Sequence, residues 1–172
     1  MVSTRARGRI ELRVQRMKVN GQQVVRLEFT SAVEMVDFVE VVSDHVGRTL
    51  GLDDDAIHWV GVAIRESVIN AIRYGNRNDV SKHVFVEFRV APADEVSGLT
   101  ICVRDQGEGF DPETLASPLE PDNLLKPSGR GIFLVRNFMD EVRWRRAPEG
   151  GMEIRMVKWL STPEAPNDST KT

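Results

Sequence analysis

Apolar and polar residues alternate along four segments of the chain, and this period of two is typical of β-strands that bury one face. The segments are residues 24–31, 83–90, 99–105 and 152–159. In residues 83–90, for example, one face is wholly apolar, whereas Glu87 and Arg89 lie on the other. A further strand and turn are expected in residues 141–151. Successive strands with one apolar face predict an antiparallel sheet whose other face meets water.

Three other segments have the pattern of helices, in which apolar residues recur every three or four positions. Residues 32–51 form the first, with Ser31 as its expected cap and Gly51 at its end. The second is residues 52–76, and its apolar stripe consists of Ile57, Val60, Ile64, Val68 and Ala71. The third is expected in residues 131–140. We therefore predict an α+β fold, a two-layer sandwich with helices on one face of a mostly antiparallel sheet.

The composition is that of an ordinary soluble protein. The chain has 172 residues, which suits one domain with a full core. It is 41% hydrophobic and 28% charged, within the usual range for globular domains. Its apolar stretches are shorter than a membrane span and its start lacks the apolar core of a signal peptide. We therefore expect a cytoplasmic protein that does not contact membranes.

Charge is unevenly distributed, although the net charge is only −3. Against Glu11 alone, residues 1–18 contain the basic residues Arg5, Arg7, Arg9, Arg13, Arg16 and Lys18. The acidic total and the lack of interleaved aromatic residues favour a solvated arm over direct nucleic-acid binding. We divide the chain into a basic arm (1–23), one folded domain (24–160) and a polar, disordered tail (161–172).

Three short stretches carry candidate chemistry. The first lies in the second predicted helix, where Glu66 and Asn70 are four residues apart and share one face. Such a pair usually only meets water, so this spacing alone is a weak signal.

The second stretch is RDQGEGF, residues 104–110. Asp105 ends a predicted strand, and Gly107 and Gly109 would allow the backbone to approach a ligand closely. A tight turn explains the same residues. The stretch is not a dinucleotide fingerprint, because the third glycine is missing, and it lacks the Gly-Lys-Ser/Thr ending of a P-loop.

The third stretch is Gly129-Arg130-Gly131, which opens the third helix after a proline-rich segment. Backbone N–H groups at a helix start, together with one arginine, can hold phosphate oxygens. When this stretch is read alone, a loop-to-helix junction with Arg130 in water is about as well supported as a phosphate site.

Together the three stretches resemble the GHKL (Bergerat-fold) ATP-binding superfamily. The segments ESVINAIRYGNRND (residues 66–79) and GRGIFLVRNFMDEV (residues 129–142) are most similar to its serine-protein kinases that act as anti-sigma factors in bacteria. One departure is Tyr74-Gly75, where members often have His-Gly.

The resemblance implies that the chain binds ATP and Mg²⁺. Asp105 would accept a hydrogen bond from the adenine amino group, with Gly107 and Gly109 beside the base and ribose. Asn70 would ligate Mg²⁺, a hard cation that is commonly held by a few side-chain oxygens and by phosphates.

The resemblance also implies which residues surround the phosphates of ATP. Gly129 and Gly131 would border the phosphates, with Arg130 near the terminal one. Glu66 would be the catalytic base that accepts the proton of a serine hydroxyl, and Arg130 would help to neutralise charge during phosphoryl transfer.

The implied function is that of an ATP-dependent serine-protein kinase acting as an anti-sigma factor. It would sequester a sigma factor and phosphorylate a small STAS-domain anti-anti-sigma protein, and related switches are homodimers. Two alternatives stay open: a non-catalytic regulator that uses ATP only to shape its partner surface, and a detached histidine-kinase ATPase domain. The sequence argues against the histidine-kinase domain, because it shows no dimerising helix with a phosphoacceptor histidine, and His45 is a poor candidate for that histidine.

Overall fold

Among the described residues, six antiparallel strands form one sheet. The computed structural model describes residues 10–90, 98–109 and 127–160, and for residues 127–130 it describes only the backbone. The strand order is β1-β2-β3-β4-β6-β5, and every neighbouring pair is antiparallel, as predicted. The strands are β1 (Leu12–Val19), β2 (Gln22–Thr30), β3 (His83–Val90), β4 (Gly98–Arg104), β5 (Glu141–Arg146) and β6 (Met152–Trp159).

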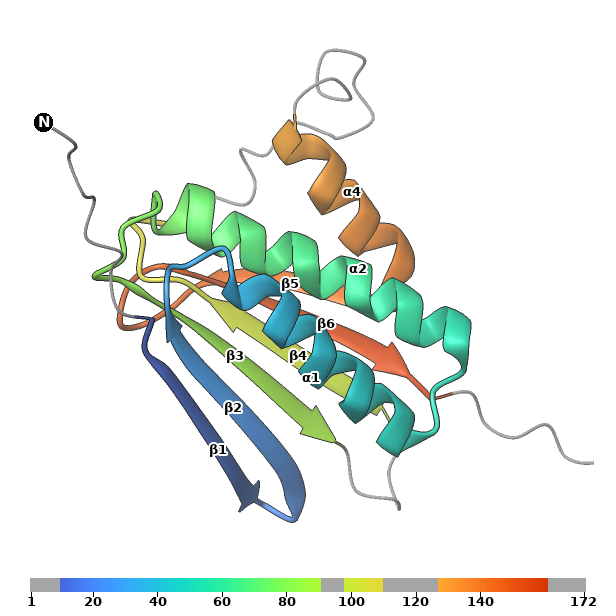
Figure 1. The fold of residues 1–172 in the computed structure, drawn as a ribbon. Coiled ribbons are helices and arrows are strands. Elements are labelled where there is room, and N and C mark those ends of the chain that lie inside the picture. Colours follow the sequence, from blue (N-terminus) through green and yellow to red (C-terminus); the bar gives the residue numbers. More distant parts are fainter. Residues whose placement is uncertain (1–9, 91–97, 110–126, 161–172) are drawn as a thin grey trace, which may run out of the picture.

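In the part of the chain that the structure describes, three helices cover one face of this sheet (Figure 1). They are α1 (Met35–Leu50), α2 (Asp54–Asn70) and α4 (Pro127–Phe138), and α2 continues into the π-helical turn η1 (Ala71–Gly75). Helix α2 lies between the other two and packs against both. Among the described segments, no helix has the length and apolar character needed to cross a membrane. The predicted two-layer α+β sandwich is confirmed.

The core forms where the apolar faces of the strands meet the apolar stripes of the helices. On β3 and β4 the buried side chains are Val84, Val86, Phe88, Leu99, Ile101 and Val103. On α2 and η1 they are Ile57, Val60, Ala63, Ile64, Val68, Ala71 and Ile72. Apart from Ala63 and Ile72, these residues lie on the apolar faces that the two periodicities predict, because each period places one set of side chains on one face. Removing this apolar surface from water is the main force that holds the helices on the sheet.

Gly51 ends α1, as its position in the sequence predicts. Its φ of +78° is left-handed, a conformation that glycine adopts without steric cost. The N–H groups of Gly51 and Leu52 donate to the carbonyls of Arg48 and Gly47, both at 3.1 Å. These bonds satisfy carbonyls that the last helical turn would otherwise leave unpaired.

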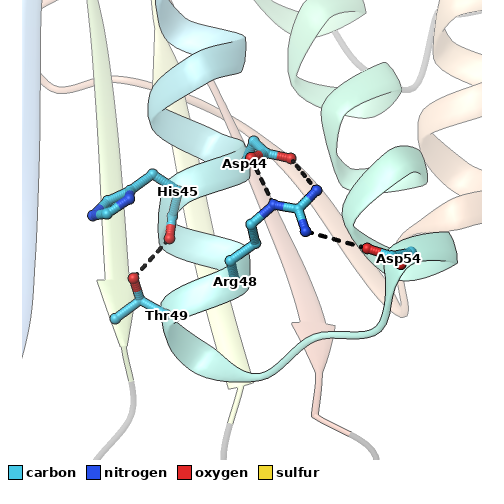
Figure 2. A network of polar contacts seen from close by, with 5 residues as sticks. All are labelled: Asp44, His45, Arg48, Thr49 and Asp54. Atoms are coloured by element: carbon cyan, nitrogen blue, oxygen red, sulfur yellow. Dashed lines mark hydrogen bonds and ion pairs between the residues drawn. The ribbon is translucent and has the colours of Figure 1, made fainter.

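Arg48 joins the end of α1 to the start of α2 (Figure 2). Its Nε donates to Asp44 Oδ2 at 3.0 Å, and its Nη1 donates to Asp54 Oδ1 at 3.3 Å. The guanidinium lies near the C-terminus of α1, where positive charge is favourable. All three groups are largely exposed, so this network adds little stability and mainly orients the connection.

The predicted cap of the first helix is wrong. Helix α1 begins at Met35, and Ser31 is instead buried at the junction before it. Its hydroxyl donates to the carbonyl of Lys82 at 2.9 Å and accepts from Asn76 Nδ2 at 2.8 Å. A residue that looks like a helix cap by local spacing therefore makes tertiary hydrogen bonds with a segment more than forty positions away.

Strand β1 lies inside the segment that we expected to be a basic arm. It pairs with β2 through a two-residue turn at Asn20 (φ +51°) and Gly21 (φ +83°). Asn-Gly strongly favours such hairpin turns, so the sequence does contain a signal for this strand. The alternation does not reveal it, because β1 is an edge strand whose side chains are mostly exposed on both faces.

Two glycine-to-alanine substitutions should change stability in opposite directions. Gly51→Ala places a Cβ on a left-handed residue, so the free energy of unfolding should fall by about 1 kcal/mol. Gly61 lies within α2, and an added Cβ there meets nothing within 4 Å. Gly61→Ala should therefore raise the free energy of unfolding by roughly 0.5–1 kcal/mol. Urea unfolding followed by circular dichroism measures both; the same sign for the two variants would contradict this account.

Candidate nucleotide-binding site

A cavity of about 320 Å³ lies between α2, α4 and the adjoining strands. Its apolar walls come from Ala71, Val103, Ile132, Val135, Trp144, Met152 and Ile154. Its polar lining comes from Ser67, Asn70, Tyr74, Arg77, Asp105 and Glu108, with Gly75 and Gly109 completing the wall. Apolar walls with a few polar groups are typical of small-molecule sites. Of the predicted site residues, Asn70, Asp105 and Gly109 line this cavity.

Asp105 is the buried carboxylate of the cavity, with 6% of its surface exposed. Its Oδ1 accepts hydrogen bonds from the N–H groups of Gly107 at 2.8 Å and Met152 at 3.2 Å. Its Oδ2 accepts none from the described residues. Burial raises the pKa of this carboxyl, and the two backbone N–H groups offset part of that rise.

Backbone without side chains encloses Asp105. A Cβ built on Gly75 would collide with the Asp105 carboxyl, and one on Gly151 would collide with the Asp105 carbonyl. A Cβ on Gly107 would collide with the Gly75 carbonyl. Glycine is therefore required at all three positions for this close approach. Of these, the sequence patterns indicated only Gly107; Gly75 and Gly151 looked like ordinary helix-end and turn residues.

Glu66, Asn70 and Gly131 come together where α4 crosses α2. A Cβ on Gly131 would lie 2.5 Å from Glu66 Oε2 and 3.5 Å from Asn70 Nδ2. A larger residue at this position would require the Glu66 carboxylate to move away from α4. The first and third candidate stretches, which are about sixty residues apart, thus form one cluster.

Helix α4 begins earlier than the sequence suggested. It starts at Pro127, so Gly129 and Arg130 lie in its first turn and Gly131 lies deeper. Proline is favoured at the first helical position because its missing N–H would have no partner there. The first-turn N–H groups still lack intrahelical partners, as a phosphate site needs. The side chain of Arg130 and the segment 110–126 between the second and third stretches lie outside the described residues.

Gly109 marks the other end of the second stretch. Its φ is +74°, so it uses the backbone freedom that its sequence position suggested. A Cβ there would lie 3.3 Å from Arg146 Nη1 and 3.4 Å from the Gly151 carbonyl. Gly109 therefore contributes a close-packed part of the cavity wall rather than a free turn.

Asn76 ties the site to the rest of the fold, and no sequence pattern singled it out. Its side chain is fully buried. Its Nδ2 donates to Ser31 Oγ at 2.8 Å and to the His83 carbonyl at 2.9 Å, and its Oδ1 accepts from Gln106 N–H at 2.7 Å. A buried amide that makes all these hydrogen bonds holds the three segments in place, because the loss of any one bond would leave a buried polar group unpaired. The only sequence signal is its place between a helix end and a strand.

The donors near α4 fit Mg²⁺ that is bound together with a nucleotide. Within residues 10–90, 98–109 and 127–160, no group of three or more His, Cys, Asp or Glu side chains could hold a metal ion by itself. The cluster offers the amide of Asn70 and the carboxylate of Glu66. Mg²⁺ commonly uses one or two such oxygens and takes its remaining ligands from phosphates and water.

The fold and the cavity indicate a class of protein. A two-layer α+β sandwich with a cavity between its helices and sheet, closed at one end by a buried carboxylate, is the arrangement expected of an ATPase domain of the GHKL, or Bergerat, type. Residues 29–158 match the family described as the histidine kinase-like ATPase domain, and the chain belongs to that family.

Several relatives are serine-protein kinases. The chain is similar to the serine-protein kinase RsbW of Staphylococcus epidermidis, with 26% identity over 156 residues, covering 87% of this chain and 95% of the relative. It is 24% identical to RsbW of Bacillus subtilis over 157 residues, covering 88% and 94% of the two chains. RsbW of Staphylococcus aureus is also 24% identical, over 156 residues, covering 87% and 95%. These matches confirm the resemblance to the serine-protein kinase branch of the superfamily.

The raised pKa of Asp105 predicts a pH-dependent effect of Asp105→Asn on stability. The pKa of Asp105 is higher in the folded protein than in the unfolded chain, so protonation of this carboxyl stabilises the fold. This stabilisation is fully present below the pKa of an unfolded aspartate, about 3.9. It is lost as the pH rises through the higher pKa of the folded protein. Asparagine keeps the acceptor for Gly107 and Met152 but does not titrate. Relative to the unsubstituted protein, the variant should therefore gain stability as the pH rises above about 4, as measured by urea unfolding. A difference that is constant with pH would contradict burial as the cause.

Proposed function

We propose that this protein is an ATP-dependent serine-protein kinase that acts as an anti-sigma factor. The observation that carries the proposal is the cluster of Glu66, Asn70 and Gly131, because Asn70 also lines the cavity that contains the buried Asp105. In this proposal a base candidate, an oxygen ligand for Mg²⁺ and a glycine-containing helix start serve the phosphates of the ligand. Asp105 supplies a hydrogen-bond acceptor for its nucleobase.

Asp105 Oδ2 accepts a hydrogen bond from the adenine amino group, while the apolar walls hold the two faces of the base. Burial of Asp105 favours selectivity for adenine, because a base without the amino donor would leave the buried acceptor unpaired. Gly107 and Gly109 let the backbone follow the base and ribose closely.

At the other end, Gly129, Arg130 and Gly131 border the phosphates at the start of α4. The first-turn N–H groups and the positive end of the helix favour negative charge there. Asn70 would hold Mg²⁺, which neutralises charge on the phosphates, and Arg130 adds to that neutralisation.

Glu66 is the base in this scheme. Its carboxylate lies one helical turn before Asn70 and beside Gly131, so it is near the position of the terminal phosphate. It accepts the proton of the incoming serine hydroxyl as the bond from that oxygen to phosphorus forms. The bond from phosphorus to the ADP oxygen breaks in the same transfer, so ADP and phosphoserine are the products.

The partners would be proteins: a sigma factor bound in the ATP state and a STAS-domain anti-anti-sigma protein that is phosphorylated on serine. The similarity to serine-protein kinases named RsbW along most of both chains supports this assignment. We further propose that the protein works in the cytoplasm as a homodimer, without direct contact to nucleic acid. The competing function is a non-catalytic regulator that is gated by ATP, and the Glu66→Gln experiment below distinguishes it from a kinase.

Glu66→Gln should abolish phosphotransfer while leaving binding intact. Transfer of ³²P from ATP to a STAS-domain protein captured from the host should fall about 100-fold or more, the usual contribution of a general base. ATP affinity should change little, since the amide has nearly the same size. Asp55→Asn, an exposed carboxyl in the first turn of the same helix, is the matched control. Full transfer by Glu66→Gln refutes the base role, and nucleotide-dependent capture without any phosphoserine favours the non-catalytic regulator.

Asp105→Asn should remove discrimination between adenine and hypoxanthine bases. The unsubstituted protein should bind ATP about tenfold or more tightly than ITP, because ITP carries a carbonyl in place of the amino donor. In the variant, ATP affinity should fall and ITP affinity should hold or rise, since the amide N–H can donate to that carbonyl. Isothermal titration of both nucleotides tests this, and equal affinities in the unsubstituted protein would place the base elsewhere.

A further inference from the structure

An ion pair bridges the rim of the cavity at the Asp105 end. Arg77 Nη2 lies 2.9 Å from Glu108 Oε2, and both residues line the cavity. Arg77 follows η1, whereas Glu108 lies in the loop that follows β4, so the pair joins two separate segments. The Glu108 carbonyl also accepts from Arg146 Nη1 at 3.0 Å, which fixes the backbone under its side chain.

The backbone at Arg77 is in an unusual conformation. Its φ is +57°, and the next residue, Asn78, has a φ of +58°. Asparagine visits this left-handed region readily, but a long side chain such as arginine does so at a steric cost. The Asn78 N–H reaches back to the Ile72 carbonyl at 2.8 Å, which holds this turn against η1. An unfavourable backbone conformation in a residue that lines a ligand cavity points to a role for its side chain there.

Stability does not explain the pair. The side chains of Arg77 and Glu108 are 73% and 79% exposed, and exposed ion pairs contribute little to folding. They also break easily, because water satisfies both partners when they separate. Arg104 and Glu149 form another ion pair, at 3.1 Å, in which Glu149 is exposed and Arg104 is partly buried, and neither residue lines this cavity. The distinctive property of the Arg77–Glu108 pair is its position across the rim.

We propose that the Arg77–Glu108 pair is a clasp that closes over the base end of the cavity and sets how long a nucleotide stays bound. This inference rests on the proposed nucleotide-binding function. With the base seated against Asp105, the pair holds the η1–β3 turn to the loop after β4, so both segments stay against the ligand. Breaking the pair frees the two segments and speeds release. Arg77 and Glu108 are thus positioning residues that act through the rim, not through the transferred phosphate.

Stopped-flow kinetics with a fluorescent N-methylanthraniloyl ATP tests the clasp on the full chain. In Arg77→Gln and in Glu108→Gln, the dissociation rate constant should rise about 1.5- to fivefold, the range expected for one exposed ion pair. The association rate constant should stay within about twofold, because the pair acts only after the base is seated. The double variant should be no faster than either single variant. Arg77→Glu combined with Glu108→Arg should recover most of the slow release.

Salt and a matched variant sharpen the test. Added salt should speed release more in the unsubstituted protein than in the single variants, because only the unsubstituted protein has this ion pair to lose. Glu149→Gln, which breaks the pair outside the cavity, should leave release unchanged. Failure of the unsubstituted protein to bind the nucleotide would reject the proposed function itself. If it binds, any of three results overturns the clasp: single-variant rates within about 1.5-fold of the unsubstituted rate, an effect of Arg77→Gln without one of Glu108→Gln, or equal rises in association and dissociation.

Discussion

The close approach of bare backbone to the Asp105 carboxyl is the constraint on which the site depends. Gly75, Gly107 and Gly151 come from three different segments, and each would collide with its neighbours if it carried a Cβ. Their contact fixes the end of α2, the end of β4 and the start of β6 relative to one another. The buried carboxylate in turn gives this junction a polar group that a ligand can satisfy. One arrangement therefore supplies both the rigidity and the selectivity of the cavity.

Helix α2 extends along the cavity and carries groups at both ends. Glu66 and Asn70 lie on regular helix, whereas Gly75 and Asn76 follow from the wider π-helical turn of η1. A π-helical turn shifts the residues after it relative to a continuous α-helix, and such turns are frequent at functional sites. Here the shift brings Asn76 into contact with three other segments. The phosphate end and the base end are thus set by one element with a change of helical pitch between them.

The face of the sheet that the helices do not cover carries rows of oppositely charged side chains. Cross-strand partners form a row across the sheet that consists of Arg13, Glu28, Phe85, Arg104, Glu153 and Arg145. Glu87 lies between Arg26 and Arg89; its partial burial raises its pKa, but hydrogen bonds from the two guanidinium groups outweigh that effect, and the net shift is downward. Cross-strand pairs of opposite charge stabilise a sheet modestly and make its face soluble. Cys102 lies on this face, where burial among carboxylates raises the pKa of its thiol to about 11 and keeps it unreactive.

The sequence by itself determined the elements and the faces that they bury. Strands β3 and β6, the α2 stripe and the end of α1 at Gly51 follow from periodicity and local backbone preference, because both are properties of neighbouring residues. Tertiary structure alone decided which residues meet. Ser31 became a partner of Asn76, Gly131 came to lie on Glu66, and Gly75 and Gly151 closed around Asp105. No local pattern reports such contacts, because they depend on strand register and helix packing between segments tens of residues apart.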